Sequence, residues 1–348
     1  MKSAVVFRCN AGSRVGQGHL VRCREMARQL TGEGHRCAML GPPRALRHPD
    51  DADLFDRWEH VPERGDSNED ARRVIALCRD MGARHAVMDD YRIDPGYQRV
   101  LKEAGLRWLQ QFDASAPWDF YADVLVNAGP MERLEHYAPY LKNPEGVVLF
   151  GPRYAVLRRA FRRLPVRADG RAVRRILVSF GGGDDMGAVA LTLKSLSERV
   201  QSGVVLVVVS GPSNPRHEEI ATLAAELPEG QVELHIDPPD TPYLLASCDM
   251  AVIAGGTMSY EAAICGLPMI FIALAPNQRR TCVGWAELAG AVYLGMVGEV
   301  KISDISCAAM RIMGDAAMRR RMAASGRELV DGQGVDRLVS ALFGKDLE

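Results

Sequence analysis

The stretch that decides the fold is residues 5–22, which read VVFRCNAGSRVGQGHLVR. An apolar strand leads into a loop with three glycines, and the loop delivers His19 to the start of a helix expected over residues 19–30. A helix start presents unpaired N–H groups and positive dipole potential. A neutral imidazole beside an anionic ligand can act there as a base. The stretch predicts a site that holds a charged substrate and moves a proton; the alternative is a polar surface or satisfied core histidine.

Strand and helix signals alternate along the rest of the chain. In the first half we expect strands at 4–8, 35–40, 86–88, 106–111, 124–126 and 147–150. In the second half we expect them at 175–179, 204–210, 232–235, 250–253, 269–272 and 291–294. Such alternation predicts parallel sheets covered on both faces. The expected fold class is α/β, with two doubly wound, Rossmann-like domains whose strand-end loops face each other across a cleft.

The expected division of the chain follows this pattern. We expect an N-terminal domain over 1–157, a linker over 158–174, a C-terminal domain over 175–325 and a helical tail over 326–348. The segment 158–175 carries eight arginines. We interpret it as a solvated connector between domains, with a weak, anion-attracting contact to a membrane surface as the alternative.

Composition narrows the function classes. The chain has 348 residues, 47% hydrophobic and 25% charged, with a formal net charge of -1, which is typical of a globular protein that does not bind nucleic acid. No apolar run is long enough to span a bilayer, and the N-terminus lacks the pattern of a signal peptide, so we expect a cytoplasmic protein. The eight cysteines are scattered and no ligand pair has metal-site spacing, so we predict reduced thiols and no metal.

A second glycine turn lies in residues 250–261, which read MAVIAGGTMSYE. Paired glycines let a ligand approach the backbone, and the helix start suits a diphosphate. Glu261, about one turn into that helix, can accept both hydroxyls of a ribose. The alternative is an ordinary Gly-Gly turn with a capping glutamate. Residues 176–185, ILVSFGGGDD, form a matching turn whose two aspartates either cap the helix expected from about Met186, as we favour, or help to bind Mg²⁺.

Other segments also follow strands. They are Asp89-Asp90-Tyr91, Phe112-Asp113, Asn127 and Pro276-Asn277-Gln278, each of which is alternatively plain turn chemistry. Several cofactor and nucleophile motifs are absent from the sequence: there is no G-x-G-x-x-G, no P-loop and no G-x-S-x-G. NAD and FAD are therefore disfavoured, and we expect no cofactor.

Four segments in order resemble one family. Residues 16–22 match a G-x-G-H-x-x-R pattern, and the match continues at 149–158, 176–182 and 254–278. They resemble the PseG family, the UDP-sugar hydrolases of pseudaminic acid biosynthesis, which is similar to the spore-coat protein SpsG. The resemblance implies a GT-B fold like that of MurG, with UDP held mainly by the C-terminal domain. It also implies metal-independent attack of water at the anomeric carbon, with inversion and release of UDP.

The resemblance and the residue pattern together suggest the site. The predicted catalytic group is His19, as general base, with Asn10, Asp90 and Tyr91. The predicted UDP contacts are Gly181, Gly182, Gly255, Gly256, Thr257, Met258, Ser259 and Glu261. The predicted sugar contacts are Gly16, Gly18, Arg22, Asn277 and Gln278. The expected substrate is a UDP-linked deoxy-acetamido sugar.

The chain departs from the family pattern at three places. Asn10 stands where an acidic residue is common, Ala114 stands where a second acid often follows Asp113, and 183–187 differ from the usual turn. If a missing carboxylate helps to activate water, the enzyme transfers its sugar to an alcohol or amine instead. A glycosyltransferase is therefore the alternative function, and a nucleotide-sugar-binding protein without turnover is a third.

Overall fold

The computed structural model describes residues 2–11, 18–62, 66–112, 118–165, 170–200 and 203–345. The chain divides into two compact units, each with its own sheet and core. Unit 1 comprises Met1–Arg158 with Gln333–Glu348, and unit 2 comprises Arg159–Gly332. The division along the chain therefore falls at the start of the arginine-rich segment, and the C-terminal residues belong to the first unit.

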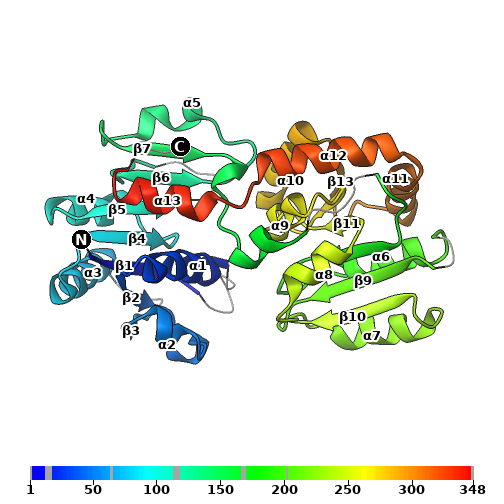
Figure 1. The fold of residues 1–348 in the computed structure, drawn as a ribbon, viewed down its shortest axis with the longest axis horizontal. Coiled ribbons are helices and arrows are strands. Elements are labelled where there is room, and N and C mark those ends of the chain that lie inside the picture. Colours follow the sequence, from blue (N-terminus) through cyan, green and yellow to red (C-terminus); the bar gives the residue numbers. More distant parts are fainter. Residues whose placement is uncertain are drawn as a thin grey trace. The chain divides into compact units, whose positions relative to one another are not determined.

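Unit 1 is built on a parallel sheet. Its strands are β1 (Ala4–Cys9), β2 (Arg36–Gly41), β3 (Arg57–His60), β4 (His85–Asp89), β5 (Arg107–Gln111), β6 (Val124–Asn127) and β7 (Val147–Phe150). Its helices are α1 (Gly18–Gly32), α2 (Asp51–Leu54), α3 (Ser67–Met81), α4 (Pro95–Glu103), α5 (Leu134–Tyr137) and α13 (Gly334–Leu342). In the described residues the strand order is β3-β2-β1-β4-β5-β6-β7 (Figure 1).

Unit 2 repeats the scheme. Its strands are β8 (Arg175–Ser179), β9 (Val205–Ser210), β10 (Val232–Ile236), β11 (Met250–Ile253), β12 (Met269–Ala273) and β13 (Val292–Met296). Its helices are α6 (Ala188–Ser197), α7 (His217–Glu226), α8 (Thr241–Ser247), α9 (Met258–Ile264), α10 (Pro276–Ala289), α11 (Ile302–Gly314) and α12 (Ala316–Leu329). The order is β10-β9-β8-β11-β12-β13, and every pairing is parallel.

Local chemistry explains why these segments form. The inner strands are near-continuous runs of buried Val, Ile and Leu, as parallel sheets covered on both faces require. α3 begins where the Asp66 side chain accepts the N–H of Glu69, and ends at Gly82 in the left-handed conformation. The prediction of two parallel α/β sheets is confirmed.

Two local expectations differ from the structure. β3 was not among the expected strands, because its sequence RWEH has no apolar run; it lies at the sheet edge with Arg57 and His60 exposed. The helix expected from Met186 begins at Ala188 instead, because Met186 and Gly187 have positive φ values of 54° and 82°, which no helix accommodates.

Candidate active site

The strands that precede the three predicted glycine segments, β1, β8 and β11, lie where the strand order reverses. In unit 1, β1 and β4 are neighbours although the chain leaves them toward opposite edges of the sheet. In unit 2, β8 and β11 have the same relation. Ligands of open α/β sheets bind outside the carboxyl ends of the strands at such switch points. The segments after β1 and β4, and those after β8 and β11, are therefore the candidate sites.

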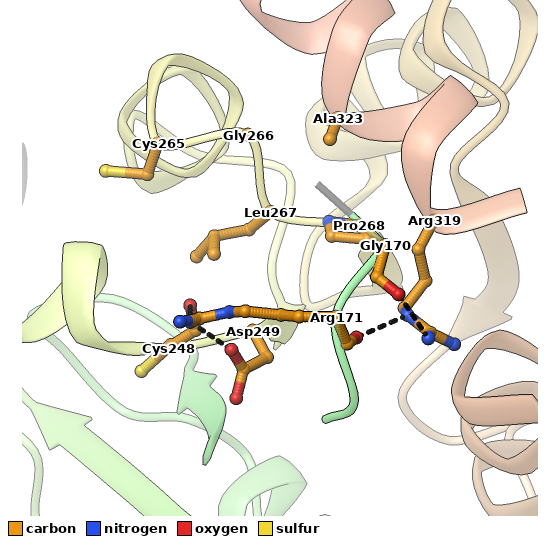
Figure 2. A pocket seen from close by; sticks show the side chains of 10 residues that line it. All are labelled: Gly170, Arg171, Cys248, Asp249, Cys265, Gly266, Leu267, Pro268, Arg319 and Ala323. Carbon is orange, nitrogen blue, oxygen red and sulfur yellow. Dashed lines mark hydrogen bonds and ion pairs between the residues drawn. The ribbon is translucent and has the colours of Figure 1, made fainter. Parts of the chain in front are cut away.

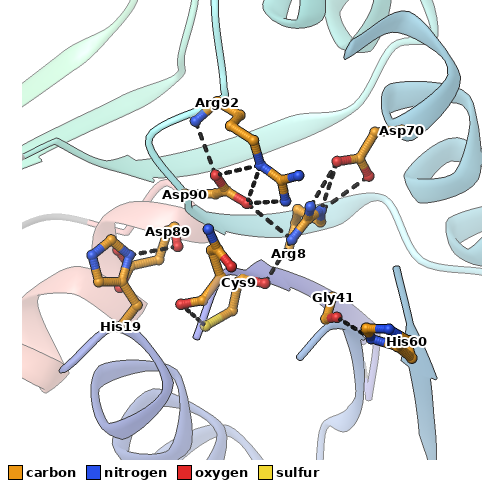
Figure 3. Close-up of polar contacts among 10 residues, drawn as sticks. Arg8, Cys9, His19, Gly41, His60, Asp70, Asp89, Asp90 and Arg92 are labelled. Atoms are coloured by element: carbon orange, nitrogen blue, oxygen red, sulfur yellow. Dashed lines mark hydrogen bonds and ion pairs between the residues drawn. The ribbon is translucent and has the colours of Figure 1, made fainter. Parts of the chain in front are cut away.

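At the first switch point, His19 of α1 contacts Asp89, the last residue of β4 (Figure 3). Its Nδ1 lies 2.9 Å from the backbone oxygen of Asp89 and 2.9 Å from Asp89 Oδ1. Because both partners are acceptors, Nδ1 carries the hydrogen, which leaves Nε2 with a lone pair when the ring is neutral. The ring also lies edge-on to Tyr91, with ring centroids 4.8 Å apart. This is a histidine oriented as a base.

Asp89 is held by a second partner. Arg22 Nε lies 2.9 Å from Asp89 Oδ2, and Arg22 Nη2 lies 2.8 Å from Oδ1, a two-pronged pair. Burial raises the pKa of the Asp89 carboxyl, but the charges of Arg22 and His19 outweigh it and hold that pKa well below its usual range. Burial lowers the pKa of His19, but the charge and hydrogen bonds of Asp89 raise it further, so the net pKa lies above the ordinary value.

Asp90 points to a different set of partners. Its carboxylate lies 3.0 Å from Nη1 of the buried Arg8 and 2.9 Å from Nη2 of Arg92 (Figure 3). Asp89, the neighbour of Asp90, is thus the carboxylate that contacts His19. A catalytic role for Asp90 stays a prediction. Asn10 lies beside the same turn, since its backbone N–H donates to the Asp89 carbonyl at 3.3 Å.

The other predicted unit 1 residues are placed in part. Gly18 is the first residue of α1, while Gly16, Asp113 and Ala114 lie outside the described residues. Sequence reasoning did not choose Asp89 from the pair Asp89-Asp90. The deciding signal is the register of β1 and β4, which sets Asp89 opposite Cys9, and register is a tertiary property.

At the second switch point, glycines allow two close approaches of the backbone to neighbouring groups. A Cβ on Gly211, after β9, would lie 2.1 Å from the Cα of Gly182, so the turns after β8 and β9 pack backbone to backbone. Gly181 has a φ of +97°, and a Cβ on Gly255 would lie 2.6 Å from Cys282 Sγ. A Cβ on Gly256, in contrast, would meet open space, as would one on Gly181 or Gly182.

The start of α9 is held by two hydrogen bonds of Ser259. Ser259 is fully buried; its hydroxyl donates to the Gly256 carbonyl at 2.7 Å and accepts the indole N–H of Trp285 at 3.0 Å. Thr257 is exposed, Met258 is half-buried and Glu261 is buried one turn along the helix. Because the Ser259 hydroxyl already has two partners, it braces the glycine turn. Its part in binding UDP stays a prediction.

The remaining predicted residues of unit 2 lie at, or just before, the starts of helices α10 and α6. Asn277 is exposed in the first turn of α10, and Gln278 Oε1 accepts the N–H of Leu274 at 2.9 Å. Asp184 and Asp185 accept the N–H groups of Met186 and Gly187, each at 2.8 Å, just before α6. No group of three or more His, Cys, Asp or Glu side chains in the described part of the chain could hold a metal ion.

A small polar cavity of unit 2 lies elsewhere (Figure 2). Most of its lining residues precede the strands β8, β11 and β12, and the others come from α12, so the cavity lies at the amino ends of these strands, away from the glycine turns. Arg171 pairs there with Asp249, and Arg319 donates to the carbonyls of Gly170 and Arg171 at 3.0 and 3.1 Å. These contacts fasten the connecting segment to unit 2 and indicate a structural role.

Comparison with known proteins supports the fold and gives distant relatives. No family model matches the chain. It is 28% identical over 196 residues to the spore coat polysaccharide biosynthesis protein SpsG of Bacillus subtilis, covering 55% of this chain and 57% of that protein. It is 22% identical over 290 residues to the UDP-2,4-diacetamido-2,4,6-trideoxy-beta-L-altropyranose hydrolase of Campylobacter jejuni, covering 81% of this chain and 96% of that enzyme. The match thus spans little more than half the length of SpsG.

Among solved structures, MurG of Acinetobacter baumannii superimposes with a TM-score of 0.70 at 15% identity, over 99% of both chains. The expected GT-B-like fold is confirmed by this likeness. None of the helices in the part of the chain that the structure describes combines the length and apolar character that crossing a bilayer requires.

Proposed function

We propose that this protein is an enzyme that hydrolyses a UDP-linked deoxy-acetamido sugar, as in pseudaminic acid-type sugar biosynthesis. The observation that carries the proposal is the buried pair of His19 and Asp89 at the switch point of β1 and β4. A histidine held through Nδ1 by a carboxylate is an arrangement that suits general base catalysis. Similarity to a hydrolase whose name specifies a UDP-diacetamido sugar supports the substrate class.

In the proposed reaction, His19 Nε2 accepts a proton from a water molecule that attacks the anomeric carbon. The bond between that carbon and the diphosphate oxygen breaks, UDP leaves with the bonding electrons, and the configuration inverts. Asp89 stabilises the imidazolium that forms and fixes the ring. Tyr91, which is partly exposed beside His19, contacts the sugar, while Asn10 and Asp90 support the turn.

The proposal assigns UDP to the second switch point. The open backbone at Gly181, Gly182 and Gly256 leaves room for the diphosphate, whose charge backbone N–H groups stabilise as UDP leaves. Thr257, Met258 and the braced Ser259 shape this turn, and Glu261 accepts the ribose hydroxyls. Sugar contacts are proposed for Gly16, Gly18, Arg22, Asn277 and Gln278, of which Arg22 also holds Asp89.

Transfer of the sugar to an alcohol or amine is the second candidate. Two observations favour it: the fold matches that of MurG over 99% of the chain, and Asn10 stands where an acidic residue is common in the family that the sequence resembles. A base at His19 deprotonates an acceptor hydroxyl as readily as water. The two candidates differ in whether UDP appears without an acceptor.

The experiment measures UDP release from a panel of UDP-sugars without acceptor, together with UDP binding by calorimetry. Wild type, His19→Ala and Glu261→Ala are compared, because the proposal separates their roles. We expect wild type to release UDP, His19→Ala to lose release while binding UDP normally, and Glu261→Ala to bind UDP at least about tenfold more weakly, as the loss of a charged hydrogen bond predicts.

Other outcomes point elsewhere. Normal UDP binding without release from any donor would favour the transferase. Equal loss of UDP affinity in both variants would contradict the division of roles between the two residues.

A further inference from the structure

Arg8 is a charged residue near the carboxyl end of a buried strand. It lies on β1, its side chain is inaccessible to solvent, and its guanidinium is fully engaged. Nε lies 3.0 Å from Asp70 Oδ1 and Nη2 lies 2.7 Å from Asp70 Oδ2. Nη1 donates to the Cys9 carbonyl at 2.6 Å and lies 3.0 Å from Asp90 Oδ2. Only the fork of an arginine reaches two carboxylates and a carbonyl at once.

The neighbouring strand makes room for this side chain. A Cβ on Gly41, the last residue of β2, would lie 2.4 Å from Arg8 Nη1 and 2.1 Å from the Cys9 carbonyl oxygen. Gly41 also has a φ of +128°, which disfavours any other residue. The space for Arg8 is thus built into the sheet.

Arg8 links helix α3 to the turn that follows β4. Asp70 lies in α3, while Asp90 opens the turn after β4. Asp90 in turn accepts the backbone N–H of Arg92 at 2.9 Å and pairs with its guanidinium, so both ends of the turn are held through one carboxylate (Figure 3). The two residues that flank Asp90 are Asp89, which orients His19, and Tyr91, which lies against its ring.

We propose that Arg8 is a positioning residue for His19: it anchors the turn 89–92 through Asp90 and thereby holds Asp89 and Tyr91 against the imidazole. This inference rests on the proposed function only for its effect on turnover. The groups that face His19 are Asp89 and Tyr91 from β4 and its turn, and Arg22 from α1. Arg8 reaches this group through Asp90, the carboxylate that it shares with Arg92.

Arg8→Lys tests the proposal, because it keeps the charge and removes the fork. The matched control is Arg24→Lys: Arg24 makes a similar two-pronged pair with Asp51, at 2.7 and 2.6 Å, and also contacts the Leu46 carbonyl, none of which belongs to the turn. The titration of His19 is followed by NMR of histidine-labelled full-length protein, with His19→Gln assigning the signal. This readout needs no substrate.

We expect the midpoint of the His19 titration to fall by about one pH unit in Arg8→Lys, because Asp89 no longer lies against the ring. We expect Arg24→Lys to titrate as wild type does. With an active donor, kcat of Arg8→Lys should fall about tenfold with KM within about twofold, the pattern of a misplaced catalytic group.

An unchanged His19 titration in a folded Arg8→Lys protein would overturn the proposal. If Arg8→Lys does not fold, Asp90→Asn, which keeps the pair of Arg8 with Asp70, takes its place; a His19 titration like that of wild type would again overturn it. If the His19 titration shifts in Arg8→Lys but the wild-type protein hydrolyses no UDP-sugar, the positioning role stands and only the proposed function is refuted.

Discussion

At the residue scale, the proposed chemistry depends on one contact, that of His19 with Asp89. Asp89 and Asp90 are adjacent, yet β4 directs only Asp89 toward α1, while Asp90 joins the guanidiniums of Arg8 and Arg92. Asp89 also forms an ion pair with Arg22, so the imidazole of His19 faces an anion whose charge is partly balanced.

Asp89→Asn should lower kcat by about 10²- to 10⁴-fold, since both the stabilising charge and the ring orientation are lost. The anion of Asp89 favours the imidazolium, so its removal lowers the pKa of His19. A base works when deprotonated, and activity is lost as pH falls through its pKa. The acid limb of the kcat/KM profile should thus lie above pH 6.5 in wild type and move to lower pH in Asp89→Asn.

The measurement is the pH profile of UDP release for both proteins. Asp56→Asn, which removes an exposed ion pair with Arg36, is the control and should match wild type. A wild-type acid limb below pH 6.5 would argue against His19 as the base.

Ser259→Ala should lower the free energy of unfolding by about 1–3 kcal/mol, because the indole N–H of Trp285 is left buried without its acceptor. Denaturant unfolding, with exposed Ser303→Ala as the control, checks this. A loss no larger than that of the control would show that the hydroxyl does not brace the glycine turn.

At the element scale, the turns after β8 and β9 act as one unit because their backbones touch. Gly211→Ala places a methyl where Gly182 already lies, and the overpacking should destabilise the protein by about 1–3 kcal/mol. Since Gly182 belongs to the proposed diphosphate site, UDP affinity should fall as well. Gly183→Ala, whose added Cβ would meet open space, is the stability control and should change little. Calorimetry and chemical unfolding measure both effects; a Gly211→Ala protein as stable as wild type would contradict the close packing.

At the scale of the whole molecule, each unit has its own core, and the end of the chain completes the first one. α13 buries Leu338 and Leu342 in the core of unit 1, and Arg107 of β5 donates to the Leu342 carbonyl at 2.8 Å. The last helix is thus part of the first unit, although 174 residues of unit 2 (159–332) separate it from the rest.

Leu338→Ala should lower the stability of unit 1 by about 2–5 kcal/mol, and Leu193→Ala should do the same to unit 2, since each removes a fully buried side chain from one core. Hydrogen exchange measured peptide by peptide separates the two effects. If Leu338→Ala accelerated hydrogen exchange in β8–β13 as much as in β1–β7, the two units would not unfold independently.

Most of the fold could be predicted from the sequence, because near-continuous apolar strands alternating with helices have few other solutions. His19 and the glycine turns were predicted for the same reason: they follow strands. Strand order, the choice of Asp89, and the network of Arg8 with Asp70 were not predicted. These depend on pairings between segments far apart in the chain, such as β1 with β4, which local patterns do not encode.

The most direct test of the account is hydrolysis of a UDP-diacetamido sugar in H₂¹⁸O without acceptor, with mass spectrometry of the released UDP. The account predicts UDP free of ¹⁸O, because water attacks the anomeric carbon and the diphosphate oxygen leaves with UDP, and it predicts no release by His19→Gln. Incorporation of ¹⁸O into UDP, or equal release by His19→Gln, would contradict it.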